Sequence, residues 1–167
     1  MEENFGEDFC CLSMVPVSIS FELDPCDAIK ARDLYEKASS GAFEKGEHED
    51  SASIGQGISG GKGRVHVSVG APLGASFDTP EAVAKEVDRQ IVEQYCLHPT
   101  NLQAYHVLRG KDAEVPDDLY LEEGDCGPKE FLERIHEMPH PHRRYALAIY
   151  ANAVESKLGP REVAAPC

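Results

Sequence analysis

The 167-residue sequence has no tryptophan and only 16 lysines and arginines, against 30 aspartates and glutamates. The formal net charge of −14 opposes a phosphate backbone, so the composition argues against a general nucleic-acid-binding role. It also disfavours electrostatic binding of this chain to anionic lipid. Because residues 51–111 carry 6 basic and 5 acidic side chains, an anionic substrate is best tolerated in that middle stretch.

Long hydrophobic runs are also missing. The longest uncharged runs, residues 9–21 and 65–77, fall short of the ~20 apolar residues that a membrane-spanning helix needs. The first residues are acidic, whereas a signal peptide begins with basic residues. The six cysteines form no Cys-x-x-Cys pair. Because no secretory signal is visible, we expect reduced thiols in a cytosolic protein.

The local patterns predict an α/β fold. Residues 12–21 are expected to form a strand, and residues 64–70, which alternate valine with polar residues, a half-buried strand. Asp24-Pro25 and Thr79-Pro80 each pair an N-cap residue with a following proline, which predicts that a helix begins at each of these places. The remaining expected elements are a loop at residues 44–53, a glycine-dense segment at 55–63, and helices at 100–109, 128–138 and 143–158, with a turn over 139–141.

These elements predict two regions. Residues 1–110 form an α/β region whose first residues, 1–11, are a loose tail, and residues 111–167 form an acidic linker followed by a helical extension. Two strands are too few for an independent sheet, so we expect further strands to be supplied from outside this chain.

The glycine-dense segment matches two catalytic patterns by letter. Residues 55–60 fit G-x-G-x-x-G, the phosphate-binding turn of dinucleotide-binding domains, and residues 57–61 fit G-x-S-x-G with Ser59 as nucleophile. Both patterns need a strand before them and a helix after them. Here a polar loop is expected before and a strand after, so neither pattern is favoured.

Two cations follow the glycines directly. Lys62 and Arg64 lie beside permissive backbone and could bind a phosphate or carboxylate. The alternative is a solvated turn that leads into a strand, since surface cations are common.

No metal or cofactor site is predicted. His136, His140 and His142 approach helical spacing, but prolines interrupt the helix between them, which favours turn histidines over metal ligands. The acidic residues within 112–125 lack the pattern of a calcium-binding loop and are typical of a solvated linker. His66 stands alone among valines and is expected to be packed rather than catalytic.

Four ordered blocks together resemble the C-terminal half of bacterial 1-acyl-sn-glycerol-3-phosphate acyltransferases. The blocks are residues 15–27 (VPVSISFELDPCD), 49–70 (EDSASIGQGISGGKGRVHVSVG), 97–105 (LHPTNLQAY) and 150–154 (YANAV). The resemblance implies part of an acyltransferase-type sheet with flanking helices, followed by a helical C-terminal extension.

Those enzymes transfer a fatty acyl group from acyl-CoA or acyl carrier protein to a hydroxyl of a glycerol phosphate at the membrane surface. In the family a histidine accepts the proton of the attacking hydroxyl, and an aspartate five positions later orients it. A Glu-Gly-x-x-Arg-like block supplies charge for the phosphate. Neither motif occurs in this sequence. In particular, none of the seven histidines is followed five positions later by aspartate.

The resemblance extends to a proline-containing strand, residues 14–17, which lines the substrate region in the family. The candidate substrate-binding residues are therefore Pro16, Lys62 and Arg64, and no catalytic residue is assigned.

The resulting expectation is a fragment of an acyltransferase of phospholipid synthesis that is inactive alone. We expect it in the cytoplasm and peripherally at the inner membrane face, which it would reach only through the missing half. The alternative is a non-catalytic binding module that pairs with a separate N-terminal half. A third, weaker reading is a hydrolase that uses Ser59. If the chain alone proves active, His66 or His98 is the base to test first.

Overall fold

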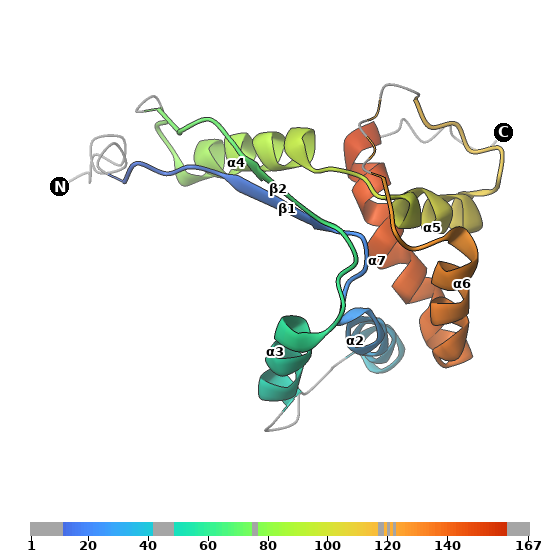
Figure 1. Ribbon diagram of the computed structural model, residues 1–167. Coiled ribbons are helices and arrows are strands. Elements are labelled where there is room, and N and C mark those ends of the chain that lie inside the picture. The colour runs from blue at the N-terminus through green and yellow to red at the C-terminus, as the bar shows by residue number, and fades with distance from the viewer. Residues whose placement is uncertain are drawn as a thin grey trace, which may run out of the picture. The chain divides into compact units, whose positions relative to one another are not determined.

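In the computed structural model the chain is a mixed α/β protein that is mostly helical (Figure 1). The structure describes residues 12–41, 49–74, 77–116, 119, 121 and 123–159. In these ranges the elements are β1 (Val17–Phe21), α2 (Asp27–Ser40), α3 (Glu49–Ser59), β2 (Val65–Val69), α4 (Pro80–Gln94), α5 (Pro99–Arg109), α6 (Pro128–Glu137) and α7 (His140–Leu158). The α/β class expected from the sequence is confirmed.

The chain forms two compact units. Unit 1 is Met1–Ser20 with His66–Cys96, and unit 2 is Phe21–Val65 with Leu97–Cys167. The boundary expected from the sequence, after residue 110, falls within unit 2, and the division into two regions stays a prediction.

In unit 1 the two strands pair as an antiparallel sheet, and α4 runs alongside them (Figure 1). The Gly70 amide donates to the Pro16 carbonyl oxygen at 2.8 Å. The Ser18 hydroxyl donates to the carbonyl oxygen of Ile91 in α4 at 3.3 Å. The serine side of β1 is therefore the side that α4 covers.

The strands bury their polar row and expose their apolar row. In β1, Ser18 and Ser20 are buried, whereas Val17 and Ile19 are 45% and 49% exposed. The valines of β2 are all exposed, and the residues between them are half-buried. The strand expected at 64–70 is thus confirmed as half-buried, but its covered side is the polar one.

A buried polar side chain of α4 helps to explain this sidedness. Gln90 is 5% exposed, and its Oε1 accepts a hydrogen bond from the Ala71 amide at 2.8 Å. Its amide nitrogen donates to Glu86 at 2.9 Å. Because buried backbone donors require partners, a polar layer between the sheet and α4 satisfies groups that valines could not.

The core of unit 2 lies among α2, α5, α6 and α7. Ala31, Tyr105, Phe131 and Val154 are each 1% exposed or less. The rings of Phe131 and Tyr150 meet edge to face at a centroid distance of 4.9 Å, a favourable aromatic geometry. The elements of this core supply most of the buried apolar side chains among the described residues.

Helix α3 is where the sequence interpretation is wrong, because it covers part of the expected loop and of the glycine-dense segment. Gly60, directly after the helix, allows close approach to the turn before α2, because a Cβ there would lie 2.5 Å from Pro25 Cβ. Gly57 is in ordinary contact with the same turn, since a Cβ there would lie 3.7 Å from Cys26 Sγ. The Gln56 side chain donates to the Pro25 carbonyl oxygen at 3.3 Å. Tertiary packing here overrides the low helix propensity of glycine.

Other helix ends follow their sequence signals. The Thr79 hydroxyl accepts from the Ala82 amide at 3.2 Å and caps α4. Gly41, with φ +73°, ends α2, and Gly110 follows α5. Among the described helices, none has the length and apolar character that crossing a membrane requires.

The expected turn over residues 139–141 is instead the beginning of α7. This helix starts at His140 rather than at Arg143, and Pro141 lies in its first turn. Proline is tolerated there because the first amides of a helix have no intrahelical acceptor. The prolines therefore separate two helices and do not form an extended loop.

Candidate functional site

The three candidate substrate-binding residues each have internal partners. Pro16 is buried in unit 1, where its carbonyl oxygen accepts the Gly70 amide. In unit 2, the Lys62 ammonium donates to two carbonyl oxygens at the C-terminal end of α3, each at 3.1 Å. Arg64 Nε donates to Asp125 Oδ1 at 3.0 Å. These contacts give all three residues a structural role, and their role in substrate binding stays a prediction.

Ser59 lies at the end of α3, and its hydroxyl donates to the Gly55 carbonyl oxygen of the same helix at 2.8 Å. A nucleophile elbow instead places its serine on a sharp turn from a strand into a helix. The geometry around Ser59 is that of an ordinary helical serine.

The histidines singled out by the sequence lie in separate settings. His66 Nε2 is 2.9 Å from Ser68 Oγ on the covered side of β2. His98 is fully buried directly before α5, and its amide donates to Asn101 Oδ1 at 2.7 Å. The His142 ring packs at 5.2 Å from that of Tyr35. In the described part of the chain, no three His, Cys, Asp or Glu side chains form a group that could hold a metal ion.

A buried carboxylate that the sequence interpretation missed lies in unit 2. Glu22 is fully buried; its Oε2 accepts the Arg64 amide at 3.0 Å, and its Oε1 accepts the Cys126 amide at 2.7 Å. The Glu22 carbonyl oxygen accepts the Thr100 hydroxyl at 2.7 Å. The end of the acidic segment, expected to be a solvated linker, is therefore bound to the core of unit 2.

Two glycines approach the Glu22 carboxylate closely. Gly63, with φ +60°, and Gly124 both approach it so closely that a Cβ on either would collide with a carboxylate oxygen. Burial and the nearby charge of Glu22 raise the pKa of the Cys126 thiol. A raised pKa favours the protonated thiol, which is the poorer nucleophile, so the surroundings of Cys126 do not activate it.

A second buried cluster joins α2, α6 and α7. Asp27 is 1% exposed, and Arg134 binds it with two hydrogen bonds of 2.8 Å, one to each carboxylate oxygen. The Tyr150 hydroxyl donates to Asp27 Oδ2 at 2.8 Å and accepts the Asp24 amide at 3.0 Å. The hydrogen bond to Asp27 raises the pKa of Arg134, and burial together with the Asp27 charge raises the pKa of Tyr150. In this cluster the charges of Asp27 and Arg134 are paired and hydrogen-bonded.

The blocks that carry the acyltransferase resemblance contain part of these two clusters, whereas Cys126 and Arg134 lie outside the blocks. Residues 15–27, 49–70, 97–105 and 150–154 each contribute at least one of the hydrogen-bonding groups. The partners are far apart in sequence, since Asp24 and Tyr150 are 126 positions apart. The sequence signal was limited to the acidic residues near the start of α2, which favour a helix N-terminus whether or not they have distant partners.

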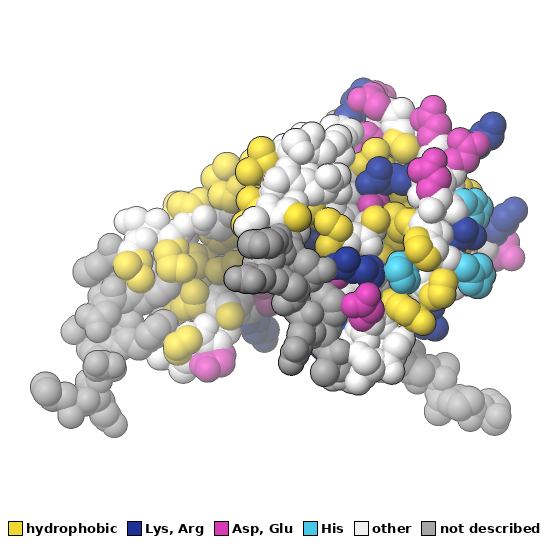
Figure 2. Space-filling model, turned by 90° about the horizontal axis from the view of Figure 1, so that it is seen from below, with side chains coloured by type: hydrophobic (Ala, Val, Ile, Leu, Met, Phe, Trp, Pro, Cys, Tyr) yellow, Lys and Arg dark blue, Asp and Glu magenta, His cyan; other side chains and the backbone are white. Residues whose placement is uncertain are grey.

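Among the described residues of unit 1, the sheet carries exposed apolar side chains. We call the four exposed side chains of Val17, Ile19, Val67 and Val69 the strand face. They are 45%, 49%, 56% and 69% exposed, respectively. Figure 2 shows hydrophobic side chains gathered at left, over the part of the molecule that holds β1 and β2. Exposed apolar side chains that gather in one part of a molecule are candidates for an interaction site.

Comparisons with protein-family models, with curated proteins and with solved structures find no match to this chain.

Proposed function

We propose that this chain is a non-catalytic binding module that covers its strand face with a second polypeptide segment, which supplies further β-structure. The observation that carries the proposal is the reversed sidedness of the sheet. Serines are buried against α4, while the β-branched apolar side chains point away from it. A sheet normally buries its apolar row, so the layer that would cover this row lies outside the described residues.

The small core of unit 1 supports the same conclusion. Among its described residues, the buried apolar side chains are those of Pro16, Val83 and Cys96. A two-stranded sheet with so little covered apolar surface is marginal by itself. Completing the burial of a half-exposed valine or isoleucine contributes on the order of 1 kcal/mol, so the four residues of the strand face together could stabilise a complex by a few kcal/mol.

The resemblance supplies the class of partner. It favours the front half of an acyltransferase, with the His-x4-Asp pair that this sequence lacks. Under this proposal the present chain belongs to a system that transfers a fatty acyl group from an acyl thioester to a glycerol phosphate. The chain itself contributes structure and is inactive alone. The internal hydrogen bonds of Lys62 and Arg64 are consistent with a structural contribution.

Binding is tested by coexpressing the chain with the His-x4-Asp half of a bacterial 1-acyl-sn-glycerol-3-phosphate acyltransferase. We expect a one-to-one complex by size-exclusion chromatography with light scattering. The double variant Ile19→Lys/Val67→Lys should weaken it by about 100-fold or more, because two charges are placed in a dehydrated interface.

A matched control replaces two exposed isoleucines of α3, as Ile54→Lys/Ile58→Lys. These side chains are 62% and 77% exposed and lie in unit 2. We expect the control to bind as the wild type does, and both double variants to unfold within about 0.5 kcal/mol of it. Equal binding by the wild type and the strand-face variant would reject the strand face as the interface.

Acyl transfer is a separate prediction. With acyl-CoA and a lysophosphatidate acceptor, the chain alone should give no turnover above background, because it lacks a histidine paired with an acid at the required spacing. The complex should be active. Turnover by the chain alone would contradict its inactivity, and His66→Ala and His98→Ala would then identify the base. A stable but inactive complex would retain the binding proposal and reject the acyltransferase assignment.

A further inference from the structure

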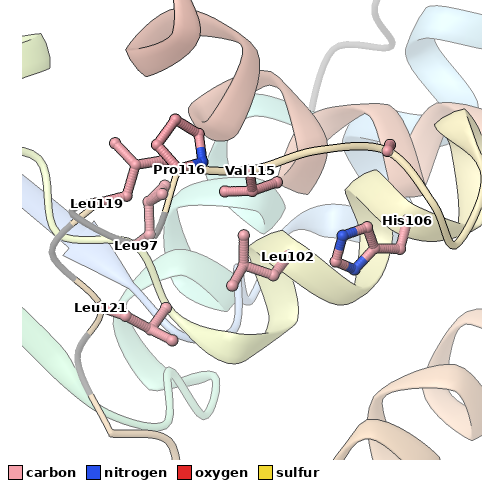
Figure 3. A pocket seen from close by; sticks show the side chains of 8 residues that line it. Leu97, Leu102, His106, Val115, Pro116, Leu119 and Leu121 are labelled. Carbon is pink, nitrogen blue, oxygen red and sulfur yellow. The ribbon is translucent and has the colours of Figure 1, made fainter.

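The outer edges of the two-stranded sheet have no strand partner in the described part of the chain. This differs from unit 2, where the exposed side chain of Leu121 lines a hollow together with Leu97 and Leu102 (Figure 3). In the sheet, exposed apolar side chains and an open backbone edge occur together. Such an edge is a template for pairing with another chain.

The register of the sheet identifies the backbone groups that face its outer edges. The Gly70 amide donates to the Pro16 carbonyl oxygen, so these two residues form a hydrogen-bonded pair. In an antiparallel ladder such pairs alternate with non-hydrogen-bonded pairs, and the alternating burial along both strands shows no bulge. Ile19 and Val67 each lie three residues inward from Pro16 and Gly70, and they therefore form a non-hydrogen-bonded pair. Their amides and carbonyls point away from the other strand, toward the two outer edges.

The outer edge of β2 is the more open of the two. The side chains of Val67 and Val69 are more exposed than those of Val17 and Ile19 in β1. Soluble proteins protect sheet edges with charged residues, prolines or bulges. Strand β2 contains no proline and no Lys, Arg, Asp or Glu, whereas Pro16 directly precedes β1. The edge of β2 therefore combines outward-facing amides with none of these protective residues.

The sequence of β2 is complementary to itself. An antiparallel copy centred on Val67 places that valine opposite its equivalent and Val65 opposite Val69, so one apolar row continues into the other. Cross-strand pairs of β-branched side chains stabilise a sheet. On the covered side, His66 lies opposite Ser68 of the second copy, and within one strand their Nε2 and Oγ atoms are already 2.9 Å apart. This register opposes no two side chains of like formal charge within β2.

We propose that two copies of this chain associate edge to edge through β2, antiparallel and about a two-fold axis at Val67. The amides and carbonyls of Val65, Val67 and Val69 hydrogen-bond across this axis. The product is a four-stranded sheet with an α4 helix from each copy, and a sheet gains stability with three or more strands. The inference does not rest on the proposed function, because the strand face of each copy stays open to a partner.

The expected dimer is weak, and its affinity depends on salt. One pair of five-residue strands buries less than the ~1,200 Å² of total surface found in stable complexes. The two copies also carry the same net charge of −14, and salt screens their repulsion. We expect a dissociation constant of about 10–100 µM in ~0.15 M salt, and weaker association at lower ionic strength. Sedimentation equilibrium of the full chain measures this constant.

Amide hydrogen exchange locates the interface. The Val67 amide faces solvent in one copy and is hydrogen-bonded in the dimer, so its exchange should slow about threefold between ~50 µM and ~1 mM chain. The Ile19 amide, on the outer edge of β1, should exchange at the same rate at both concentrations. A dimer in which the Val67 amide exchanges at an unchanged rate would place the interface elsewhere and overturn the proposal.

Val67→Pro and Ile19→Pro are a matched pair of variants. Each removes one outward-facing amide and keeps an apolar side chain, and a strand tolerates proline where its amide faces outward. We expect Val67→Pro to raise the dissociation constant about tenfold or more, and Ile19→Pro to leave it within about twofold. Equal constants for the two variants, or a wild-type chain that is still monomeric at ~1 mM, would contradict pairing through β2.

A second pair of variants leaves the backbone unchanged. Val67→Lys sets two ammonium groups directly opposite each other across the axis, where like charges destabilise a sheet. In Ile19→Lys the two charges are three strand spacings apart, roughly 14 Å, which exceeds the Debye length of ~8 Å at physiological salt. Only Val67→Lys should weaken the dimer, by about tenfold, and equal weakening by both would reject the β2 edge. All these measurements use the chain alone, so their failure is distinguishable from failure of the coexpression test.

Discussion

Replacing Arg134 by methionine should lower the free energy of unfolding by about 3 kcal/mol. The change removes both hydrogen bonds to Asp27 and leaves a carboxylate buried without a cation. Losing one partner of a buried pair typically costs about 3–5 kcal/mol, and the partial exposure of Arg134 places the expected value at the low end. Urea unfolding followed by far-UV circular dichroism measures the loss.

The control for this prediction is a lysine on the same helix. Lys129 pairs with Glu133 at 3.7 Å, but both side chains are mostly exposed. Lys129→Met should therefore change the stability by less than about 0.5 kcal/mol. A double-mutant cycle with Asp27→Ala should show a coupling of at least about 1 kcal/mol between Asp27 and Arg134. Additive effects would show that the buried pair does not act as a unit.

Replacing Gly63 by alanine should cost about 3 kcal/mol of stability through two effects. Its φ of +60° is a left-handed conformation that costs alanine about 1 kcal/mol. The new methyl group would also collide with the carboxylate of Glu22. That carboxylate cannot move aside freely, because it is fully buried and holds the amides of Arg64 and Cys126.

Gly41 separates the two effects. It has a similar φ of +73°, but nothing lies within 4 Å of an added Cβ. Gly41→Ala should therefore cost only the backbone term of about 1 kcal/mol. The difference between the two variants in urea unfolding measures the packing of Glu22. If the two losses are equal, the close approach of Gly63 to Glu22 has no energetic consequence.

The buried clusters show why sequence patterns reached only part of the candidate site. Glu22 directly follows β1 and Asp27 is the first residue of α2, and acidic residues at such places are typically exposed. Their burial depends on Cys126 and Arg134, which are more than 100 positions away. No periodicity within one segment encodes such a pairing.

The anion-binding role expected of Lys62 and Arg64 also rests on a local pattern that does not include their partners in the fold. A cation beside glycines favours anion binding when nothing else is known. The structure gives these side chains acceptors at the end of α3 and at Asp125. Whether a substrate displaces these acceptors depends on a binding competition that the sequence pattern does not describe.

The sequence by itself determined the elements whose signals are local. Thr79 and Gly110 mark helix ends, and the valine alternation marks β2, because capping and strand period depend on residues only a few positions apart. Only the tertiary structure decided which row of the sheet is covered and that a helix forms through Gly57. Those outcomes depend on the surfaces that α4 and the turn at Pro25 present, and segments distant in sequence meet there only after folding.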